Sequence, residues 1–228
     1  MKTLLNQNNL IFDPPPFDCV LYLPGLPGGS SIIHDRSPWG NHGTITGAAW
    51  KRLSNGLWYL SFDGSDDYAS IADKDSLDFG GGSFTVKLWL YLVGAYGDLI
   101  GKYHSAQAGR WGFSIKNAVT IRFYTAAGVP ELTVNNLANS WQLLTFLVNR
   151  EDDKLYVYQQ GCLKNSISFA PQTFTNAVDL TIGKYASAQW GNLQCNVALC
   201  SIHKRALSGL EIQNAFNREK HLFGVWEK

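Results

Sequence analysis

The sequence predicts an all-β protein: a two-sheet antiparallel β-sandwich with one short helix near its C-terminus. Apolar and polar residues alternate over several short segments, as in strands that cover a core with one face. The 22 glycines and 8 prolines suit a fold with many short strands and turns. With 228 residues, 45% of them hydrophobic, the chain can bury one large core.

The clearest strand is expected over residues 84–92. Its even-numbered positions are all apolar and share one face, whereas Thr85, Lys87, Trp89 and Tyr91 share the other. Further strands are expected where apolar residues alternate or run together, at residues 111–115, 119–124, 143–148 and 155–158. Strand signals at this spacing are typical of a sandwich or jelly roll.

One helix is predicted near the C-terminus. Ser208 and Glu211 have the spacing of a capping box, in which the serine caps the third amide and the glutamate reaches back. Leu207 and Ile212 flank this box and can form a hydrophobic staple. The helix therefore begins directly after Ser208.

The chain divides into an N-terminal arm, residues 1–18, and one domain, residues 19–228. The arm is polar and ends near three consecutive prolines, Pro14 to Pro16, which favour an extended conformation. The N-terminus has no apolar segment of the kind found in signal peptides. We therefore expect a protein made in the cytoplasm, which a virion could then incorporate.

Charge and hydropathy exclude two classes of partner. The net charge is +1 and no basic stripe is present, which argues against nucleic-acid binding. No apolar run reaches the roughly 18 residues needed for membrane insertion. The four cysteines also lack the spacing of zinc ligands.

Several segments, taken in order, resemble the laminin-G-like jelly-roll family of the concanavalin A-like lectin/glucanase superfamily. They are Asp35–Thr44 (DRSPWGNHGT), Leu60–Tyr68 (LSFDGSDDY), Ser83–Trp89 (SFTVKLW), Leu155–Tyr158 with Gly161, and Arg205–Ser208 with Glu211. The resemblance extends over roughly residues 19–220. It implies two curved antiparallel sheets packed face to face. The superfamily contains glycan-binding modules, adhesion domains, glycosidases and phage structural proteins, so the fold alone does not select a function.

Catalysis is not expected. The resemblance would place glucanase carboxylates on one strand in an E-x-D-x-x-E pattern, which is absent here. The acidic residues lie mostly in turn segments, and none of the five histidines has the context of a nucleophile-activating base. We therefore predict no catalytic residues and a chain that is not an enzyme.

Structural calcium is the one cofactor considered. Calcium takes six to eight oxygen ligands, often carboxylates in glycine-rich turns. Asp35, Asn41, Asp66 and Asp67 are the candidate ligands, since family members often hold an ion near the first motif. The alternative is that Asp35 forms an Asx turn and that Asp66 and Asp67 form a hairpin turn.

Glycan binding would use exposed aromatic side chains together with a few polar groups. Tyr103, Trp111, Tyr185 and Trp190 are the candidates, because the segments around them are rich in Gly, Ser and Gln. The alternative is that these rings fill the core or cover sheet edges.

Two functions remain open. The first is a surface or decoration component of a larger assembly, such as a phage capsid or tail, with protein subunits as partners. The arm and a near-neutral, aromatic-rich surface favour this first hypothesis. The second is a stand-alone lectin-like module with a glycan as its partner.

Overall fold

The computed structural model describes residues 17–25, 31–94, 96–185 and 191–225. These residues form strands, one α-helix and two short 3₁₀ helices. In chain order they are β1 (Cys19–Leu23), β2 (Ile32–Ile33), β3 (Gly43–Thr46), β4 (Ala49–Arg52), β5 (Trp58–Asp63), β6 (Tyr68–Ile71), η2 (Asp75–Leu77), β7 (Phe84–Leu92), β8 (Gly97–Lys102), β9 (Trp111–Asn117), β10 (Thr120–Thr125), β11 (Glu131–Thr133), β12 (Trp141–Asn149), β13 (Lys154–Gln159), β14 (Cys162–Ser168), β15 (Leu180–Ile182), β16 (Gln194–His203), α1 (Gly209–Glu219) and η3 (Lys220–Phe223).

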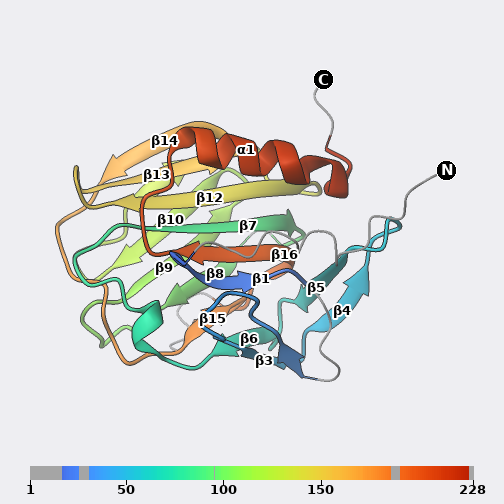
Figure 1. Ribbon diagram of the computed structural model, residues 1–228, viewed down its shortest axis with the longest axis horizontal. Coiled ribbons are helices and arrows are strands. Elements are labelled where there is room, and N and C mark those ends of the chain that lie inside the picture. Colours follow the sequence, from blue (N-terminus) through green and yellow to red (C-terminus); the bar gives the residue numbers. More distant parts are fainter. Residues whose placement is uncertain (1–16, 26–30, 95, 186–190, 226–228) are drawn as a thin grey trace.

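The strands form two antiparallel sheets packed face to face (Figure 1), which confirms the predicted sandwich. Sheet A has the order β14-β13-β12-β7-β16-β5-β4, and β1 pairs with the second half of β16. Sheet B has the order β11-β10-β9-β8-β15-β6-β3-β2. Neighbouring strands are often distant in sequence, so most of the fold rests on long-range pairing.

Aromatic rings join the two sheets in the core. Phe113 of sheet B stacks on Phe146 of sheet A with 4.2 Å between ring centroids, and Trp111 lies 5.0 Å from Phe84. These side chains are almost fully buried. Such aromatic contacts supply much of the buried apolar area of a sandwich core.

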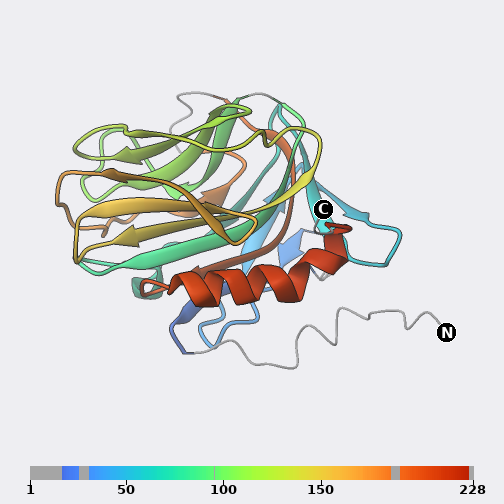
Figure 2. The ribbon, with the colours of Figure 1, turned by 90° about the horizontal axis from the view of Figure 1, so that it is seen from above.

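Helix α1 covers the outer face of sheet A (Figure 2). The even-numbered residues of β7 point into the sandwich core, and Trp89 points the opposite way, under the helix. Its ring stacks on Phe223 at 4.1 Å. Because both faces are covered, every residue of β7 except Tyr91 is buried. The predicted division of residues 84–92 between two faces is confirmed.

The helix begins where its capping box predicts. The backbone N–H of Glu211 donates to the Ser208 hydroxyl, and the backbone N–H of Ser208 donates to the Glu211 carboxylate at 2.8 Å. Leu207 and Ile212 are both buried. The cap fixes the start of α1 and hence the position of the Arg205–Ser208 segment that leads into it.

The last residues of the predicted arm, Phe17 and Asp18, contact the domain. The carboxylate of Asp18 accepts from Arg205 Nε at 2.8 Å, and its carbonyl accepts from the Lys204 backbone at 2.7 Å. The Phe17 ring meets Trp39 edge-on at 5.5 Å. The proline-rich part of the arm lies outside the described residues.

Candidate functional site

A pocket of about 500 Å³ opens on the outer face of sheet A, beside the N-terminal end of α1. Small-ligand sites typically enclose about 300–1,000 Å³. Strands β12 and β13 form its floor, and the segment leading into α1 forms one wall. It is lined by Leu147, Asn149, Tyr156, Tyr158, Arg205, Ala206, Leu207, Ser208, Gly209 and Glu211.

Strand alternation places two tyrosines in this pocket. Leu155 and Val157 of β13 are fully buried in the sandwich core, so Tyr156 and Tyr158 point to the outer face. Both tyrosines are partly exposed. On the adjacent strand, Leu147 pairs with Tyr156 and completes an aromatic and aliphatic floor.

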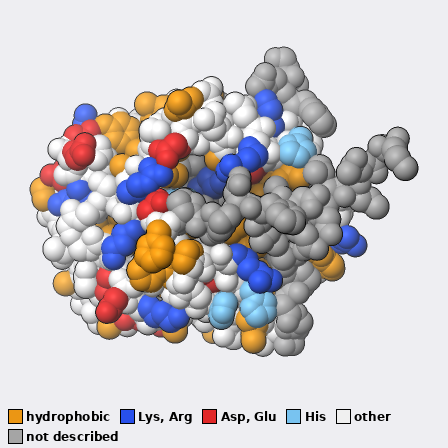
Figure 3. All heavy atoms as spheres, in the orientation of Figure 1, with side chains coloured by type: hydrophobic (Ala, Val, Ile, Leu, Met, Phe, Trp, Pro, Cys, Tyr) orange, Lys and Arg blue, Asp and Glu red, His pale blue; other side chains and the backbone are white. Residues whose placement is uncertain are grey.

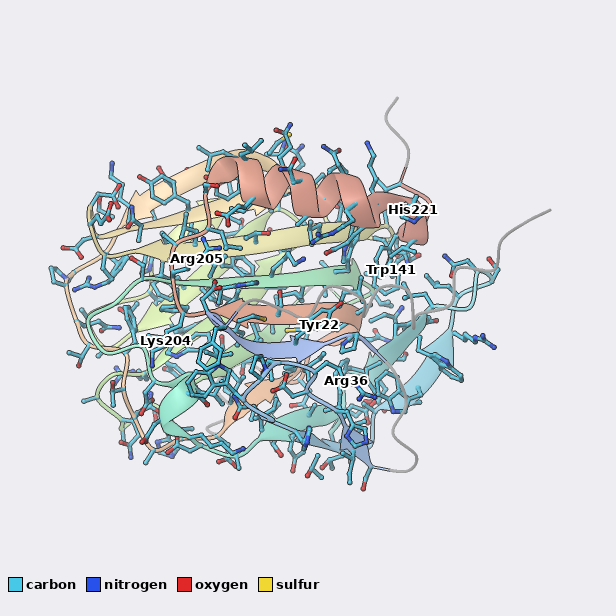
Figure 4. All side chains as sticks on the ribbon, viewed as in Figure 1. Tyr22, Arg36, Trp141, Lys204, Arg205 and His221 are labelled. Atoms are coloured by element: carbon cyan, nitrogen blue, oxygen red, sulfur yellow. The ribbon has the colours of Figure 1, made fainter. Side chains whose placement is uncertain are left out.

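An ion network borders the pocket. Arg205 donates to both oxygens of Glu211, at 2.6 and 3.0 Å, and to Asp18 at 2.8 Å. Figure 4 places Arg205 on the connection that leads from β16 to α1. Hydrogen bonds from Arg205 and from the Ser208 backbone lower the pKa of Glu211 to about 2. The guanidinium is thus paired with two carboxylates.

Both pocket tyrosines stay neutral at physiological pH. The Tyr156 hydroxyl donates to the Asp152 carboxylate, which raises the pKa of Tyr156. Burial raises the pKa of Tyr158. A neutral tyrosine offers an apolar ring face and a polar hydroxyl together.

The carboxyl groups that line the pocket can be compared with those that glycoside hydrolysis typically needs. Glycoside hydrolysis typically needs two carboxyl groups about 5 to 10 Å apart, facing the same bond. Among the described lining residues, Glu211 is the one carboxylate, and Arg205 and Ser208 occupy both of its oxygens. The polar side-chain groups that line the pocket and could orient a ligand include the Tyr158 hydroxyl and the amide nitrogen of Asn149.

Residues 63–213, well over half of the chain, match the family profile Laminin_G_3, which describes the concanavalin A-like lectin/glucanases superfamily. The chain belongs to this superfamily. The resemblance seen in the sequence motifs is thereby confirmed, and the pocket lies within a fold whose members include carbohydrate-binding lectins.

Binding domains of toxins are among the solved structures that are similar to this chain. The binding domain of Paraclostridial Mosquitocidal Protein 1 has a TM-score of 0.70 and 17% identity, covering 88% of this chain and 52% of that one. The receptor-binding domain of the botulinum neurotoxin C/D mosaic serotype has a TM-score of 0.68 and 13% identity, covering 89% and 51%. At these identities the likeness establishes the fold.

A third similar structure is of botulinum neurotoxin type C, described as entering cells through two ganglioside molecules. Its TM-score is 0.67 with 14% identity, covering 89% of this chain and 52% of that one. The chain thus spans about half the length of each of these binding domains. No curated protein matches it. Among the described residues, no helix is both long and apolar enough to cross a lipid bilayer.

The predicted glycan contacts are not brought together on an open surface. Trp111 is fully buried between the sheets, so its choice as a sugar-stacking ring is corrected: its strand turns it toward Phe84. Tyr103 and Tyr185 do meet, with 4.9 Å between ring centroids, but both are buried on the outer face of sheet B. Trp190 lies outside the described residues.

The four predicted calcium ligands fall into two separate hydrogen-bonding groups. Asp35 accepts four hydrogen bonds, from the backbones of Tyr22, Ser37 and Asn41 and from the Ser37 hydroxyl, at 2.5 to 2.8 Å. The Asp35 carboxylate therefore fits the Asx-turn alternative, because its oxygens accept hydrogen bonds from within the protein. The amide of Asn41 is likewise bonded to Val20 and Ser76.

Asp66 and Asp67 lie instead with Asp63, and one ligand atom from each residue falls within 4.8 Å of the others. Asp67 also accepts from the Asp63 backbone at 2.8 Å. Carboxylate oxygens grouped in this way suit calcium, with Asp63 in place of Asp35 and Asn41. Calcium binding itself stays a prediction.

The residues missed by sequence reasoning are the pocket residues, above all Tyr156 and Tyr158. A usable signal was present, since the alternation over residues 155–158 puts the two tyrosines opposite Leu155 and Val157. The wall contributed by Arg205 has no local sequence signal, because it depends on where the connection from β16 to α1 lies on sheet A.

Proposed function

We propose that this superfamily member is a non-enzymatic binding module whose pocket beside α1 takes a neutral oligosaccharide. The observation that carries the proposal is the placement of Tyr156 and Tyr158 on the pocket floor. Tyrosine ring faces suit the C–H faces of sugars, and their hydroxyls suit sugar hydroxyls.

Electrostatics favour an uncharged ligand. Arg205 is held by Glu211 and Asp18, so it offers little free positive charge to an acidic sugar. The similar toxin structures include a binding domain in complex with SialylT and one of botulinum neurotoxin type C, whose cell entry is described as dependent on two ganglioside molecules. These ligands support glycans as a partner class, and the paired arginine argues for a neutral member of that class.

The test is a glycan array probed with the wild-type chain, with the double variant Tyr156→Ala/Tyr158→Ala, and with Tyr96→Ala as the matched control. Tyr96 is 44% exposed and does not line the pocket. We expect hits with neutral glycans that the double variant loses and the control keeps. Hits that are unchanged in the double variant would exclude the pocket as the binding site. A blank array with folded protein would exclude a glycan as the ligand.

A second candidate function is a component of a larger assembly, such as a phage capsid or tail, with protein subunits as partners. One observation favours it: Phe17 and Trp39 form an aromatic pair and are 74% and 41% exposed. Exposed aromatic side chains are enriched in protein interfaces. Sedimentation of the wild type and of Phe17→Ala/Trp39→Ala, with Val93→Ala as control, would detect self-assembly. A monomer in all three cases contradicts a homomeric assembly.

A further inference from the structure

The outer face of sheet B carries a buried tyrosine cluster built over two glycines. Gly101 of β8 and Gly112 of β9 are paired in register. A Cβ on Gly112 would lie 2.5 Å from the Tyr185 hydroxyl, and one on Gly101 would lie 3.2 Å from the Tyr185 ring. Without side chains at these positions, the ring of Tyr185 lies directly against the sheet.

Tyr103 and Tyr124 complete the cluster. Their ring centroids lie 4.9 and 5.9 Å from that of Tyr185. The Tyr185 hydroxyl is buried and has no hydrogen-bond partner among the described residues, and the buried Tyr124 hydroxyl faces Ser114 and Arg122. The rings pack against one another, so the cluster is closed as it stands.

Asp98 lies beside this cluster, and no cationic side chain among the described residues pairs with its carboxyl group. It is fully buried, and neither carboxylate oxygen has a hydrogen bond of normal geometry within the described part of the chain. Its register partner on β9 is Ser114. The Tyr185 backbone N–H faces the carboxyl and favours its charged form, but by less than burial opposes that form.

Among the described residues, none of the charged and titratable groups around Asp98 forms an ion pair with it. Tyr103, Tyr124 and Tyr185 all interact electrostatically with it, and burial raises the pKa of each tyrosine, so they stay neutral. Arg122 pairs with Glu131 at 2.9 Å, and Arg110 lies over the Tyr103 ring. A carboxyl buried in this way favours its neutral form, and its pKa is raised to about 7.

The chain between β15 and β16 is attached to the sheet around Asp98. The Asp98 backbone N–H donates to Gly191 at 3.2 Å, and the Leu193 backbone N–H donates to Gly183 at 3.0 Å. A Cβ on Gly97 would lie 2.8 Å from Leu193. A change in charge at Asp98 would therefore act on both described ends of this chain segment, residues 183–185 and 191–193.

We propose that protonation of Asp98 controls whether Tyr185 and residues 191–193 stay packed on the outer face of sheet B. With the proton in place, the neutral carboxyl is tolerated under the tyrosine cluster and the face is covered. Without it, an unpaired negative charge is buried, and these residues separate from the sheet to hydrate it. Separation exposes a polar and aromatic surface that includes Ser114 and Tyr124.

Linkage between protonation of Asp98 and opening determines how the packing of Tyr185 changes with pH. The packed state holds its proton up to about pH 7, whereas an open, hydrated carboxyl loses it near its ordinary pKa of 3.8. Opening therefore becomes about tenfold more favourable per pH unit between these two values and levels off above them. This inference concerns sheet B and does not depend on a ligand in the pocket of sheet A.

The test is amide hydrogen exchange of the full chain from pH 5 to 8.5, corrected for the intrinsic pH dependence of exchange. In the wild type, peptides covering residues 180–185 and 191–197 should exchange about tenfold faster per pH unit up to pH 7. Asp98→Asn should remove this increase, and Glu151→Gln, a change at an exposed carboxyl, should keep it. The same pH response in wild type and Asp98→Asn overturns the proposal.

A second measurement needs no variant. Carbon-13 NMR of the aspartate side-chain carboxyls in the wild-type chain should give Asp98 a titration midpoint near pH 7. If every aspartate titrates below pH 5, Asp98 is charged in the packed state and the proposal fails.

Discussion

The outer faces of the two sheets bury their charged side chains in opposite ways. On sheet A, the Lys87 ammonium meets Glu219 at 2.6 Å, and the indole N–H of Trp89 donates to the second carboxylate oxygen at 2.8 Å. On sheet B, Asp98 is as deeply buried but has no such partners among the described residues. The paired carboxylate fastens helix α1 to its sheet, whereas the unpaired one makes the packing of Tyr185 sensitive to protons.

Charged side chains of both signs are mixed on the face of the molecule that Figure 3 shows. On the face that carries β1, basic and acidic side chains are interspersed around a hydrophobic patch (Figure 3). Among the described residues visible on this face, no large area carries charges of one sign, in line with the net charge of +1 (Figure 3). Recognition on this side is therefore expected to depend on shape and hydrogen bonding more than on long-range attraction.

The largest effect is expected from breaking the buried pair on sheet A. Glu219→Gln keeps the shape of the side chain but leaves the Lys87 ammonium buried without a negative partner. We expect a loss of about 3–5 kcal/mol in the free energy of unfolding, measured by urea denaturation.

The exposed pair Lys116–Glu131 supplies the control, since Glu131→Gln should cost no more than about 1 kcal/mol. The double change Lys87→Met/Glu219→Leu should recover most of the loss, because no unpaired charge remains. Equal costs for Glu219→Gln and Glu131→Gln would contradict the contrast between the two faces.

A smaller effect is expected from Gly112→Ala on sheet B. The new methyl group would lie within 2.5 Å of the Tyr185 hydroxyl, so the ring must leave its position. Overpacking of this kind costs about 1–3 kcal/mol, and exchange protection of residues 183–185 should fall with it. Gly81→Ala, where nothing lies within 4 Å, is the control and should stay within about 0.5 kcal/mol of the wild type.

Local patterns in the sequence are enough to predict the two-sheet fold, strand β7 and the start of α1. Each rests on a short-range rule: alternation over residues 84–92, and the capping pair Ser208–Glu211. The same alternation places Trp111 on the apolar face with Phe113, so its burial was also predictable. Its assignment as a glycan contact gave more weight to the nearby Gly- and Ser-rich segment than to the strand pattern.

The remaining site features depend on contacts between distant segments. Tyr185 is buried because it packs against Gly101 and Gly112, more than 70 residues earlier. One lone pair of the Asp35 carboxylate accepts a hydrogen bond from the backbone of Tyr22, on strand β1. The pocket exists because the segment that leads into α1 lies beside β12 and β13. No local pattern encodes these pairings, so a single sequence leaves them open.

The calcium prediction can now be tested on the residues that lie together. If calcium binds at Asp63, Asp66 and Asp67, EDTA should lower the melting temperature, and Asp66→Asn should remove that sensitivity. Asp35→Ala should lower the melting temperature with or without EDTA, because it removes four hydrogen bonds from the fold. An unchanged melting temperature of the wild type in EDTA contradicts calcium binding.

The smallest effect is expected at Glu211, and its pH dependence has the sign opposite to that of Asp98. Arg205 and Ser208 lower the pKa of Glu211 from 4.5 to about 2, so its charge stabilises the folded state above pH 4.5. This contribution is lost as the pH falls from 4.5 to 2. Because the Glu211 side chain is 43% exposed, Glu211→Gln should cost no more than about 1 kcal/mol at pH 6 and almost nothing at pH 2.

Urea denaturation of the wild type and of Glu211→Gln between pH 2 and 6 measures this difference. Glutamine can still accept the capping hydrogen bond, so a difference that stays constant with pH would mean that the charge of Glu211 contributes nothing. Acid would then leave the wall of the pocket on sheet A intact. If the difference in unfolding free energy between the wild type and Glu211→Gln shrinks at low pH, acid weakens the wall of the pocket. Acid also favours the packed state of Tyr185 on sheet B. The two faces would then respond to the same change in pH in opposite directions.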